Sequence, residues 1–445
     1  MPEEFLYVFS YDTSIEVSIS ASSEAFGFMS MYQSDANAKY SETYVPADID
    51  VKVNQEAFHF DEVGIRVKGN TSRSSFFYDG QFVNLPHLKV SLKATFDGEE
   101  YGETELLPFR HDWSNDADGR KVRKKRNLYG LEKFDLKAVA RNNDGSSAGG
   151  CTLRELYAYD SFREFGVDAP YANLSTVTLR CGDSTISHKY EFIETYDKQF
   201  LTRRYGKTEG AGDLYKCVYN GMGKADLSRS GAIDKTTGER IANGKIGVEN
   251  KLRYYSPVYQ LKTNDNEEDS DFSSMANFIH DIHACAYGNG NQQLLESALD
   301  VDEFLRMSAV SYLLGNFDDQ RYNYNNYYLY FRPSDGKAMV LPYDWDWCLG
   351  LDAGYRMDAK KPLDEWTLDG GTNSNLYQAT LVRTSSPAYS LDGYRSAFLQ
   401  DIAEMKDVVL NGQRYGDFAA KIGMENSMET SSVLEYMRAK RSVCS

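Results

Sequence analysis

The sequence of 445 residues predicts an α+β protein in which a β-rich first lobe is followed by a mainly helical second lobe. Apolar and polar residues alternate in the first part of the chain, which is typical of strands with one buried face. From Thr152 onward, apolar residues recur at helical spacing. Two short apolar runs interrupt the helical part and indicate a small inserted hairpin. We expect a first lobe over residues 1–195, which is β-rich and includes one helix, and a mainly helical second lobe over 196–445.

Four segments of the first lobe justify its assignment as β-rich. SIEVSISA (14–21), DIDVKVN (48–54) and VGIRVKGN (63–70) alternate and end in turn-forming residues. HLKVSLKATF (87–96) follows the same pattern and stops at Asp97-Gly98. These segments predict neighbouring strands.

A segment rich in charge, Gly and Asn, residues 110–130, predicts a long loop. It contains the basic run RKVRKKR, residues 120–126. Such a run is usually a solvated surface, and the alternative is a docking patch for an acidic or phosphorylated partner. Both interpretations remain open from the sequence.

The helical pattern begins with TLRELYAYDSFREFG, which places apolar residues near a spacing of 3.6 and ends at Gly166. STVTLRC and HKYEFIETY then predict a hairpin. The second lobe is expected to contain two amphipathic helices and two short strands: FSSMANFIHDIHACAY (272–287), VDEFLRMSAVSYLLGN (301–316), NYYLYF (326–331) and KAMVLPYDWDW (337–347).

The composition excludes several classes of protein. A net charge of −17 argues against a protein built mainly to coat nucleic acid or an anionic membrane. We expect no membrane span, because no run of about 18 apolar residues occurs, and no signal peptide, because MPEEFLYVFS lacks the basic-then-apolar pattern. None of the six cysteines forms a CxxC pair, so a zinc site of the usual spacing is not expected.

The segment DWDW, residues 344–347, carries the first chemical signal. If the strand continued through it, Asp344 and Asp346 would share one face, and Trp345 and Trp347 would pack on the other. Carboxylates that lie side by side repel unless a cation or hydrogen-bond donors separate them. We interpret the two aspartates as a metal-holding pair.

The segment GNFDDQRYNYNNYYLYF, residues 315–331, adds Asp318, Asp319 and Asn326. Carboxylates and a carboxamide without nearby thiolates suit Mg²⁺ or Mn²⁺, cations that also bind substrate phosphates. A loop that supplies Asp and Asn, followed by a hairpin that supplies Asp, has the order of a protein-kinase site, although neither HRD nor DFG is present. The structural alternative is that these residues form turns and helix caps.

The first lobe offers candidate phosphate contacts. The segment IRVKGNTSRS, residues 65–74, places a small-residue turn after a strand, where backbone N–H groups can approach phosphate. Lys89 and Lys93 lie four apart and therefore on one strand face, for which a solvated surface is the alternative. The candidate nucleotide-binding residues of the turn are Gly69, Asn70, Ser72 and Arg73.

These motifs occur in a series that resembles the spore coat protein H (CotH) kinase-like family. YVPADIDVKVNQEAFHFDEVGIRVKGNTSR resembles the opening strands and loop of that family, and HLKVSLKATFD its Lys-bearing strand. NDGSSAGGCTLRELYAYDSFREFGVDAP is similar to the family's Leu-Arg helix, and YEFIETYDKQFLTRRYG with GDLYK to its hinge region. NYYLY and the Asp-x-Asp strand complete the series.

The resemblance implies a two-lobed atypical protein-kinase-like fold that uses ATP and Mg²⁺ or Mn²⁺ to phosphorylate Ser or Thr of protein substrates, including coat proteins. It implies that Asp318, eight residues before Asn326, is the catalytic aspartate, with Asp319 as a rival. Asn326 and Asp344 would be metal ligands, assisted by Asp346.

The resemblance also implies that Lys93 contacts phosphates and that Glu194 lies at the hinge or pairs with a lysine. It implies a place outside the cytoplasm, in a spore coat, on a cell surface or secreted. Because the chain is acidic, we expect its substrate segments to be basic.

Two alternatives stay open. The first is a non-catalytic surface, coat or adhesion domain on a kinase-like fold. The second is a glycan-active enzyme in which two carboxylates act as acid and base and some of the 33 tyrosines stack on sugars. ATP-dependent phosphorylation would separate the main hypothesis from both.

Overall fold

The computed structural model describes residues 1–31, 40, 42–69, 73–139, 152–228, 245–249, 256–264, 272–351, 374–382 and 387–444. The chain forms two compact units. Unit 1 contains residues 1–152, 170–203 and 250–255, and unit 2 contains residues 153–169, 204–249 and 256–445. The helix that begins at Thr152 falls almost entirely within unit 2, although the sequence placed it in the first lobe.

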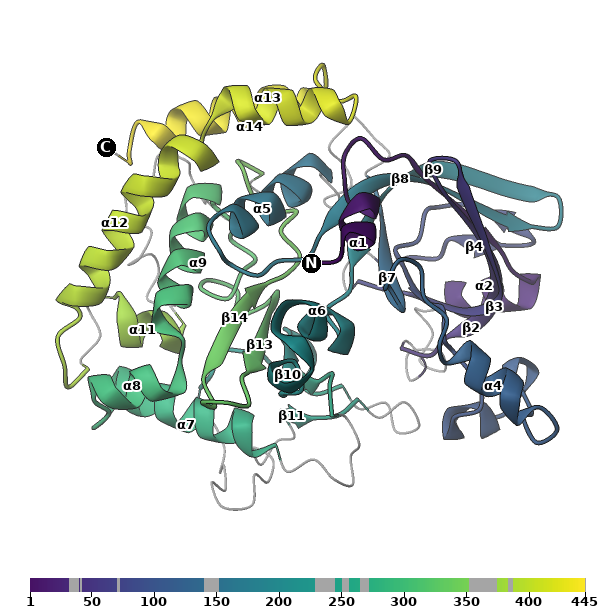
Figure 1. Cartoon of the computed structure of the whole chain (residues 1–445), viewed down its shortest axis with the longest axis horizontal. Coiled ribbons are helices and arrows are strands. Elements are labelled where there is room, and N and C mark those ends of the chain that lie inside the picture. Colours follow the sequence, from purple (N-terminus) through teal and green to yellow (C-terminus); the bar gives the residue numbers. More distant parts are fainter. Residues whose placement is uncertain are drawn as a thin grey trace. The chain divides into compact units, whose positions relative to one another are not determined.

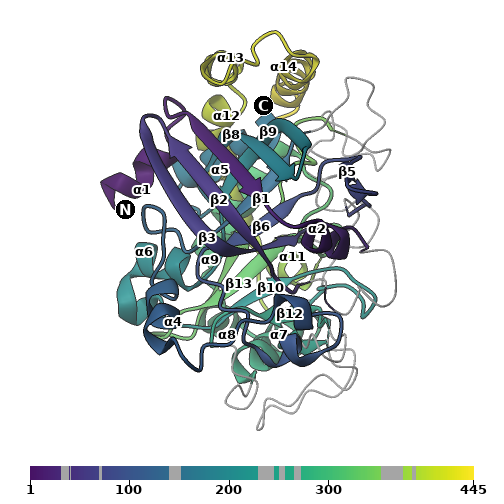
Figure 2. The same cartoon turned by 90° about the vertical axis from the view of Figure 1, so that its right-hand side faces the viewer.

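Unit 1 is built on a closed barrel with the strand order β1-β2-β3-β6-β7-β9-β8. Neighbouring strands are antiparallel except β1 and β8, which pair in parallel. Figure 2 shows β1, β2 and β3 side by side on one wall. The strands are β1 (Ile15–Ser20), β2 (Val45–Val53), β3 (Glu56–Val67), β6 (Leu88–Ser91), β7 (Lys133–Ala138), β8 (Ala172–Cys181) and β9 (Ser184–Glu194).

The alternating sequence explains the barrel. Along β2, every second side chain from Val45 to Val53 is buried, and the residues between them are more exposed. Val51 of β2 packs in one continuous apolar core with buried residues of other strands, such as Ile65 of β3 and Phe192 of β9. The period-two patterns of β1 and β2 thus place one face of each of these strands inside, as the sequence predicted, whereas β7 is buried along nearly its whole length.

The remaining elements of unit 1 are short. They are α1 (Glu3–Val8), α2 (Ser23–Ser30), β4 (Phe77–Tyr78), β5 (Gln81–Phe82), the 3-10 helices η1 (Glu99–Gly102) and η2 (Leu107–Phe109), and α4 (Ala117–Arg123). The prediction of a continuous loop over 110–130 is wrong at α4, whose N-cap Asp116 accepts a hydrogen bond from the Gly119 N–H.

The basic run around α4 is partly anchored within unit 1. Arg120 pairs with Asp97, Arg123 with Glu62 and Arg126 with Asp61. The lysines at 121, 124 and 125 are exposed. The arginines therefore tie the segment to its neighbours, and the lysines form its solvated surface.

Unit 2 contains a five-stranded sheet with the order β11-β12-β10-β13-β14. Helix α9 packs beside β14, and α12 lies beside α9 (Figure 1). The strands are β10 (Leu214–Cys217), β11 (Ile246–Gly247), β12 (Tyr259–Leu261), β13 (Tyr327–Phe331) and β14 (Ala338–Pro342). The helices are α5 (Thr152–Glu164), α7 (Ser273–Tyr287), α8 (Gln292–Ala298), α9 (Val301–Leu314), α11 (Asn375–Thr380), α12 (Asp392–Val409), α13 (Gly412–Lys421) and α14 (Met428–Arg441).

Helix α6 (Lys198–Glu209) contains the boundary between the two units. The prediction of an α+β fold with a β-rich first part and a helical later part is confirmed. The inserted hairpin exists as β13 and β14, although it belongs to a larger sheet. The division at residue 195 into functional lobes stays a prediction.

No helix in the described ranges has both the length and the apolar composition needed to cross a bilayer.

Candidate functional site

The hairpin of β13 and β14 brings the two acidic segments together. Tyr327, the first residue of β13, pairs with Pro342, the last residue of β14. Just beyond this pair, the N–H of Tyr343 donates to the carbonyl oxygen of Asn326 at 3.2 Å. Loop 315–326, which precedes β13, and loop 343–351, which follows β14, therefore meet at the same end of the hairpin.

Helix α9 delivers the first loop. Its N-cap is Asp300, whose side chain accepts from the Glu303 N–H, and its C-cap is Gly315. Gly315 has a φ of 66°, and a Cβ there would lie 2.3 Å from the hydroxyl oxygen of Tyr436. Both the positive φ and the close approach require glycine, so this residue fixes where the loop leaves the helix.

Asp318 lies among three amide side chains. Its carboxylate accepts from Nδ2 of Asn323 at 2.6 Å, of Asn326 at 2.9 Å and of Asn325 at 3.4 Å. Burial raises the pKa of Asp318, and the charge of Asp344 raises it further, while the amide hydrogen bonds oppose the shift. The amides thus hold a partly buried carboxylate in one orientation, which suits a group that must accept a proton from a substrate.

Asp319 has a different environment. It is buried, and its Oδ1 accepts from the backbone N–H groups of Arg321 and Tyr322, both at 3.0 Å. Burial raises the pKa of Asp319 to about 6, although the Arg321 charge opposes this. These bonds are those of a residue that shapes the loop, so the geometry favours Asp318 over Asp319 for the catalytic role.

The sequence-based geometry of DWDW is wrong, because β14 ends at Pro342 and the segment is not a strand. Asp344 has a φ of 58°, which turns the chain away from the extended path. Trp345 packs edge-on against Phe162, with ring centroids 4.7 Å apart, and Trp347 packs against Phe317. The two tryptophans therefore contact different rings instead of covering one back face.

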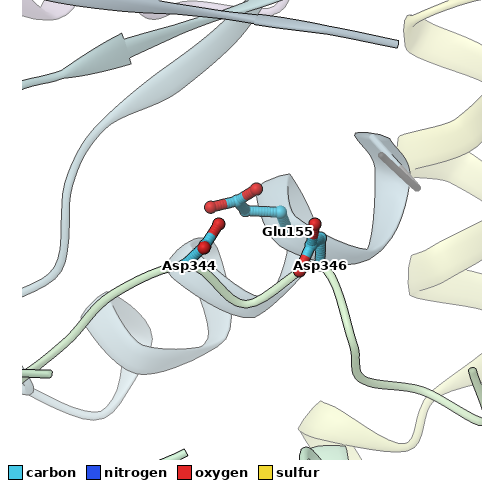
Figure 3. A group of neighbouring side chains, drawn as sticks. All are labelled: Glu155, Asp344 and Asp346. Carbon is cyan, nitrogen blue, oxygen red and sulfur yellow. The ribbon is translucent and has the colours of Figure 1, made fainter. Parts of the chain in front are cut away.

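Asp344 and Asp346 nevertheless come together, and a third carboxylate joins them. Glu155 of α5 contributes an oxygen that lies within 4.8 Å of oxygens from both aspartates. Figure 3 shows Glu155 projecting from the helix toward the loop that carries Asp344 and Asp346. Glu155 and Asp346 are buried, and Asp344 is half-buried.

The donor set fits a hard divalent cation. All three members are carboxylates, and the side-chain Oδ1 of Asn326, whose Nδ2 donates to Asp318, is a further candidate ligand on the neighbouring loop. Oxygen donors of this kind are those that Mg²⁺ and Mn²⁺ prefer. Buried carboxylates this close together repel strongly, which a cation would relieve.

The sequence did not single out Glu155. It lies about 190 residues before the aspartates and fits the pattern of an ordinary amphipathic helix. The available signal was a pair of adjacent charged residues, Arg154 and Glu155, within the otherwise apolar and aromatic stretch LRELYAY.

In unit 1, a second charged cluster centres on Asp135 of β7. Its carboxylate lies 2.8 Å from Nζ of Lys68 and 3.5 Å from Nζ of Lys89. Burial lowers the pKa of Lys89 to about 8, against the effect of Asp135. Burial disfavours the charged form of Asp135, but the two lysines hold its pKa well below the usual range. The sequence predicted Lys89 but not Lys68 or Asp135.

The other predicted residues of unit 1 lie as follows. Lys93 lies beyond β6, which ends at Ser91, so the prediction that it shares a strand face with Lys89 is wrong; Lys93 pairs with Glu132. Arg73 donates to the carbonyl oxygen of Gly69 at 2.6 Å and pairs with Glu42. Gly69 has a positive φ of 96°. Asn70 and Ser72 lie outside the described residues.

Glu194 is buried, and it accepts from the guanidinium of Arg203 at 2.6 Å and from the N–H of Tyr171 at 3.1 Å. Arg203 is therefore a charged partner of Glu194, which is the last residue of β9; the sequence offered either a place at the hinge or a pairing with a lysine.

Comparison with known proteins identifies the family to which the chain belongs. The model of the family described as CotH kinase protein matches residues 97–416. This range covers most of the chain, so the protein belongs to the CotH kinase protein family. The range includes the loops around Asp318 and Asp344 as well as Glu155, and it begins after Lys89 and Lys93.

No curated protein matches the chain. A solved structure that matches is the complex of HipA, HipB and its operator DNA from the toxin–antitoxin system of Shewanella oneidensis MR-1. The identity is 12%, the match covers 70% of this chain and 57% of that chain, and the TM-score is 0.32. This similarity is distant and adds nothing to the assignment of residues.

Proposed function

We propose that the protein is an ATP-dependent and divalent-cation-dependent kinase that phosphorylates Ser or Thr residues of a protein substrate. The observation that carries the proposal is the convergence at one end of the β13–β14 hairpin. There, Asp318 with its amides lies on one loop, and Asp344 and Asp346 lie on the other, with Glu155 beside them. Membership of a kinase family supports the reaction class.

Each residue has a distinct role in this proposal. Asp344, Asp346 and Glu155 would hold Mg²⁺ or Mn²⁺, with Asn326 as a further oxygen ligand. When bound, the cation would neutralise charge on the phosphates of ATP. Asp318 orients the substrate hydroxyl and accepts its proton, and Asn323 and Asn326 keep its carboxylate in place.

The phosphate contacts in unit 1 are assigned to Lys89 and Lys68, which supply positive charge around Asp135. Of the two predicted lysines, Lys89 has the stronger support, because it shares Asp135 with Lys68 and so belongs to a cluster of two lysines. Gly69 and Arg73 remain candidates for the same function. Charge-assisted contacts of this kind are the usual way in which kinases hold nucleotide phosphates.

The finer features are also proposals. We propose a protein substrate whose acceptor segment is basic, because the chain carries a net charge of −17. The spore-coat link in the family's name supports a location outside the cytoplasm, which fractionation of the producing cell would test.

The direct test is incubation with γ-labelled ATP and Mg²⁺ or Mn²⁺, with Ser- and Thr-containing peptides and the chain itself as acceptors. Mass spectrometry should locate new phosphate on Ser or Thr, and Asp318→Asn should remove the label. Phosphate transfer that persists in EDTA, or release of sugar from glycans without ATP, would contradict the proposal. A wild-type chain that binds no Mg·ATP would support the non-catalytic alternative.

A further inference from the structure

The hydroxyl group of Tyr159 connects two of the three clustered carboxylate residues. It donates a hydrogen bond to Oε1 of Glu155 at 2.7 Å and accepts one from the backbone N–H of Asp344 at 3.1 Å. Tyr159 and Glu155 lie four residues apart on α5 and therefore share one face of the helix. One side-chain oxygen thus joins the helix to the loop that carries the aspartates.

We propose that Tyr159 is a positioning residue that fixes Glu155 and Asp344 at the spacing required by Mg²⁺ or Mn²⁺ and so favours these ions over Ca²⁺. This inference rests on the metal site of the proposed function. Tyr159 itself supplies no ligand, and its effect is exerted through the two residues that it contacts.

The backbone of Asp344 needs such support. Its φ of 58° lies in the left-handed region, where a residue other than glycine is strained by about 1–3 kcal/mol. Two consecutive N–H groups that lead into the turn are held: that of Tyr343 by the carbonyl oxygen of Asn326, and that of Asp344 by the hydroxyl oxygen of Tyr159. These two bonds help to keep the Asp344 carboxylate directed to one place.

The Glu155 side chain needs support for an electrostatic reason. Before a cation binds, its carboxylate faces those of Asp344 and Asp346 within 4.8 Å, and like charges at this separation repel. A rotation of the Glu155 side chain would relieve the repulsion and open the site. The donated O–H bond opposes that rotation, and Tyr159 cannot easily follow it because its side chain is fully buried.

A fixed spacing affects cations differently. Mg²⁺ demands near-ideal octahedral geometry at short distances, whereas Ca²⁺ accepts 6–8 oxygen ligands at longer and more variable distances. A site whose ligands are held before binding therefore favours the smaller ion. If the ligands become free to move, the affinity for Ca²⁺ should suffer less than the affinity for Mg²⁺ or Mn²⁺.

The test uses the full chain, without nucleotide, and the metal alone. Mn²⁺ binding is measured by the electron paramagnetic resonance signal of the free ion, and Mg²⁺ and Ca²⁺ by competition against Mn²⁺. Tyr159→Phe keeps the ring and removes both hydrogen bonds. Loss of a residue that orients metal ligands typically costs about 10–100-fold in metal affinity. We expect this loss for Mn²⁺ and Mg²⁺, with a smaller loss for Ca²⁺.

The matched control is Tyr157→Phe. Tyr157 is also buried on α5, but its hydroxyl donates to the carbonyl oxygen of Val409 at 2.9 Å. Both variants lose a buried hydroxyl, so both should lose stability in EDTA, and only Tyr159→Phe should lose Mn²⁺ affinity. Tyr159→Leu adds a packing defect; equal Mn²⁺ affinities for Tyr159→Phe and Tyr159→Leu, despite unequal melting temperatures, would assign the effect to the hydroxyl.

The outcomes are distinct. Unchanged Mn²⁺ affinity in Tyr159→Phe, or equal losses for Mn²⁺ and Ca²⁺, would overturn the positioning role while leaving the metal site intact. A wild-type chain that binds none of the three ions would overturn the metal site of the proposed function, and this inference with it.

Discussion

The buried side chain of Glu303 leads to a quantitative prediction of how the free energy of unfolding depends on pH. It is buried on α9, its Oε2 accepts from the N–H of Val340 at 3.3 Å, and Oε1 has no hydrogen-bond partner among the described residues. Burial raises the pKa of Glu303 to about 8, from an ordinary value of 4.5. Asp300 and Asp168 add to this effect, whereas the Val340 hydrogen bond and Arg306 oppose it.

The consequence for stability has a definite sign. Because the pKa of Glu303 is higher in the folded state, its contribution is most favourable below about pH 4.5 and declines as the pH rises toward 8. Each unit of pH in this window costs about 1.4 kcal/mol, so the loss between pH 4.5 and 7 is about 3 kcal/mol. A neutral Gln at this position should not show this loss.

The assay is urea unfolding at several pH values between 5 and 8 for wild type, Glu303→Gln and the control Asp302→Asn. Asp302 is exposed on the same helix, so Asp302→Asn removes a carboxylate from the surface and leaves the buried Glu303 in place. We expect Glu303→Gln to gain stability over wild type progressively as the pH rises, and Asp302→Asn to follow the wild-type profile. Parallel profiles for all three proteins would refute the assignment of a buried, proton-binding Glu303.

Three further predictions concern the proposed reaction. Asp318→Asn should lower turnover by about 10²–10⁴-fold with little change in ATP affinity, whereas Asp319→Asn should mainly lower the free energy of unfolding, by about 1–3 kcal/mol; the reverse ranking would contradict the geometry. Lys89→Met should weaken ATP binding more than Lys93→Met, as measured by calorimetry, and equal effects would contradict the assignment of Lys89. Basic Ser peptides should be phosphorylated faster than matched acidic ones, by a margin that shrinks as salt shortens the Debye length from about 8 Å; a preference for acidic peptides would redirect attention to the exposed lysines beside α4.

Local patterns in the sequence were sufficient for much of the fold. Alternation along β2 and β3 predicted strands with one buried face, and the helical spacing of 152–166 and 301–316 predicted α5 and α9. The basic run was harder, because the ion pairs that anchor Arg120 and Arg123 involve residues 23 and 61 positions away. Closure of the barrel likewise depends on the pairing of β1 with β8, which no local pattern reveals.

In the candidate site, too, some features could be predicted from local sequence and others depend on distant residues. Asp318, Asn326 and Asp344 could be singled out as candidates because acidic and amide residues are concentrated in two segments separated by one short strand. The backbone reversal at Asp344 could not, because a positive φ at aspartate depends on hydrogen bonds supplied by distant residues. Glu155 was missed because its place beside Asp344 and Asp346 depends on tertiary proximity and not on its neighbours in the sequence.

The measurement that tests the central claim most directly is the binding of ATP, by calorimetry, with Mg²⁺ and with EDTA, in wild type, Asp344→Ala and Asp335→Ala. Asp335 lies at the other end of the same hairpin and pairs with Arg332, so its variant controls for loss of an aspartate from these strands. We predict that wild type and Asp335→Ala bind ATP in a Mg²⁺-dependent manner. Folded Asp344→Ala should lose this dependence, because the site loses one of its three anionic ligands and the neutral Asn326 cannot replace it. Normal Mg·ATP affinity in a folded Asp344→Ala protein would contradict the account.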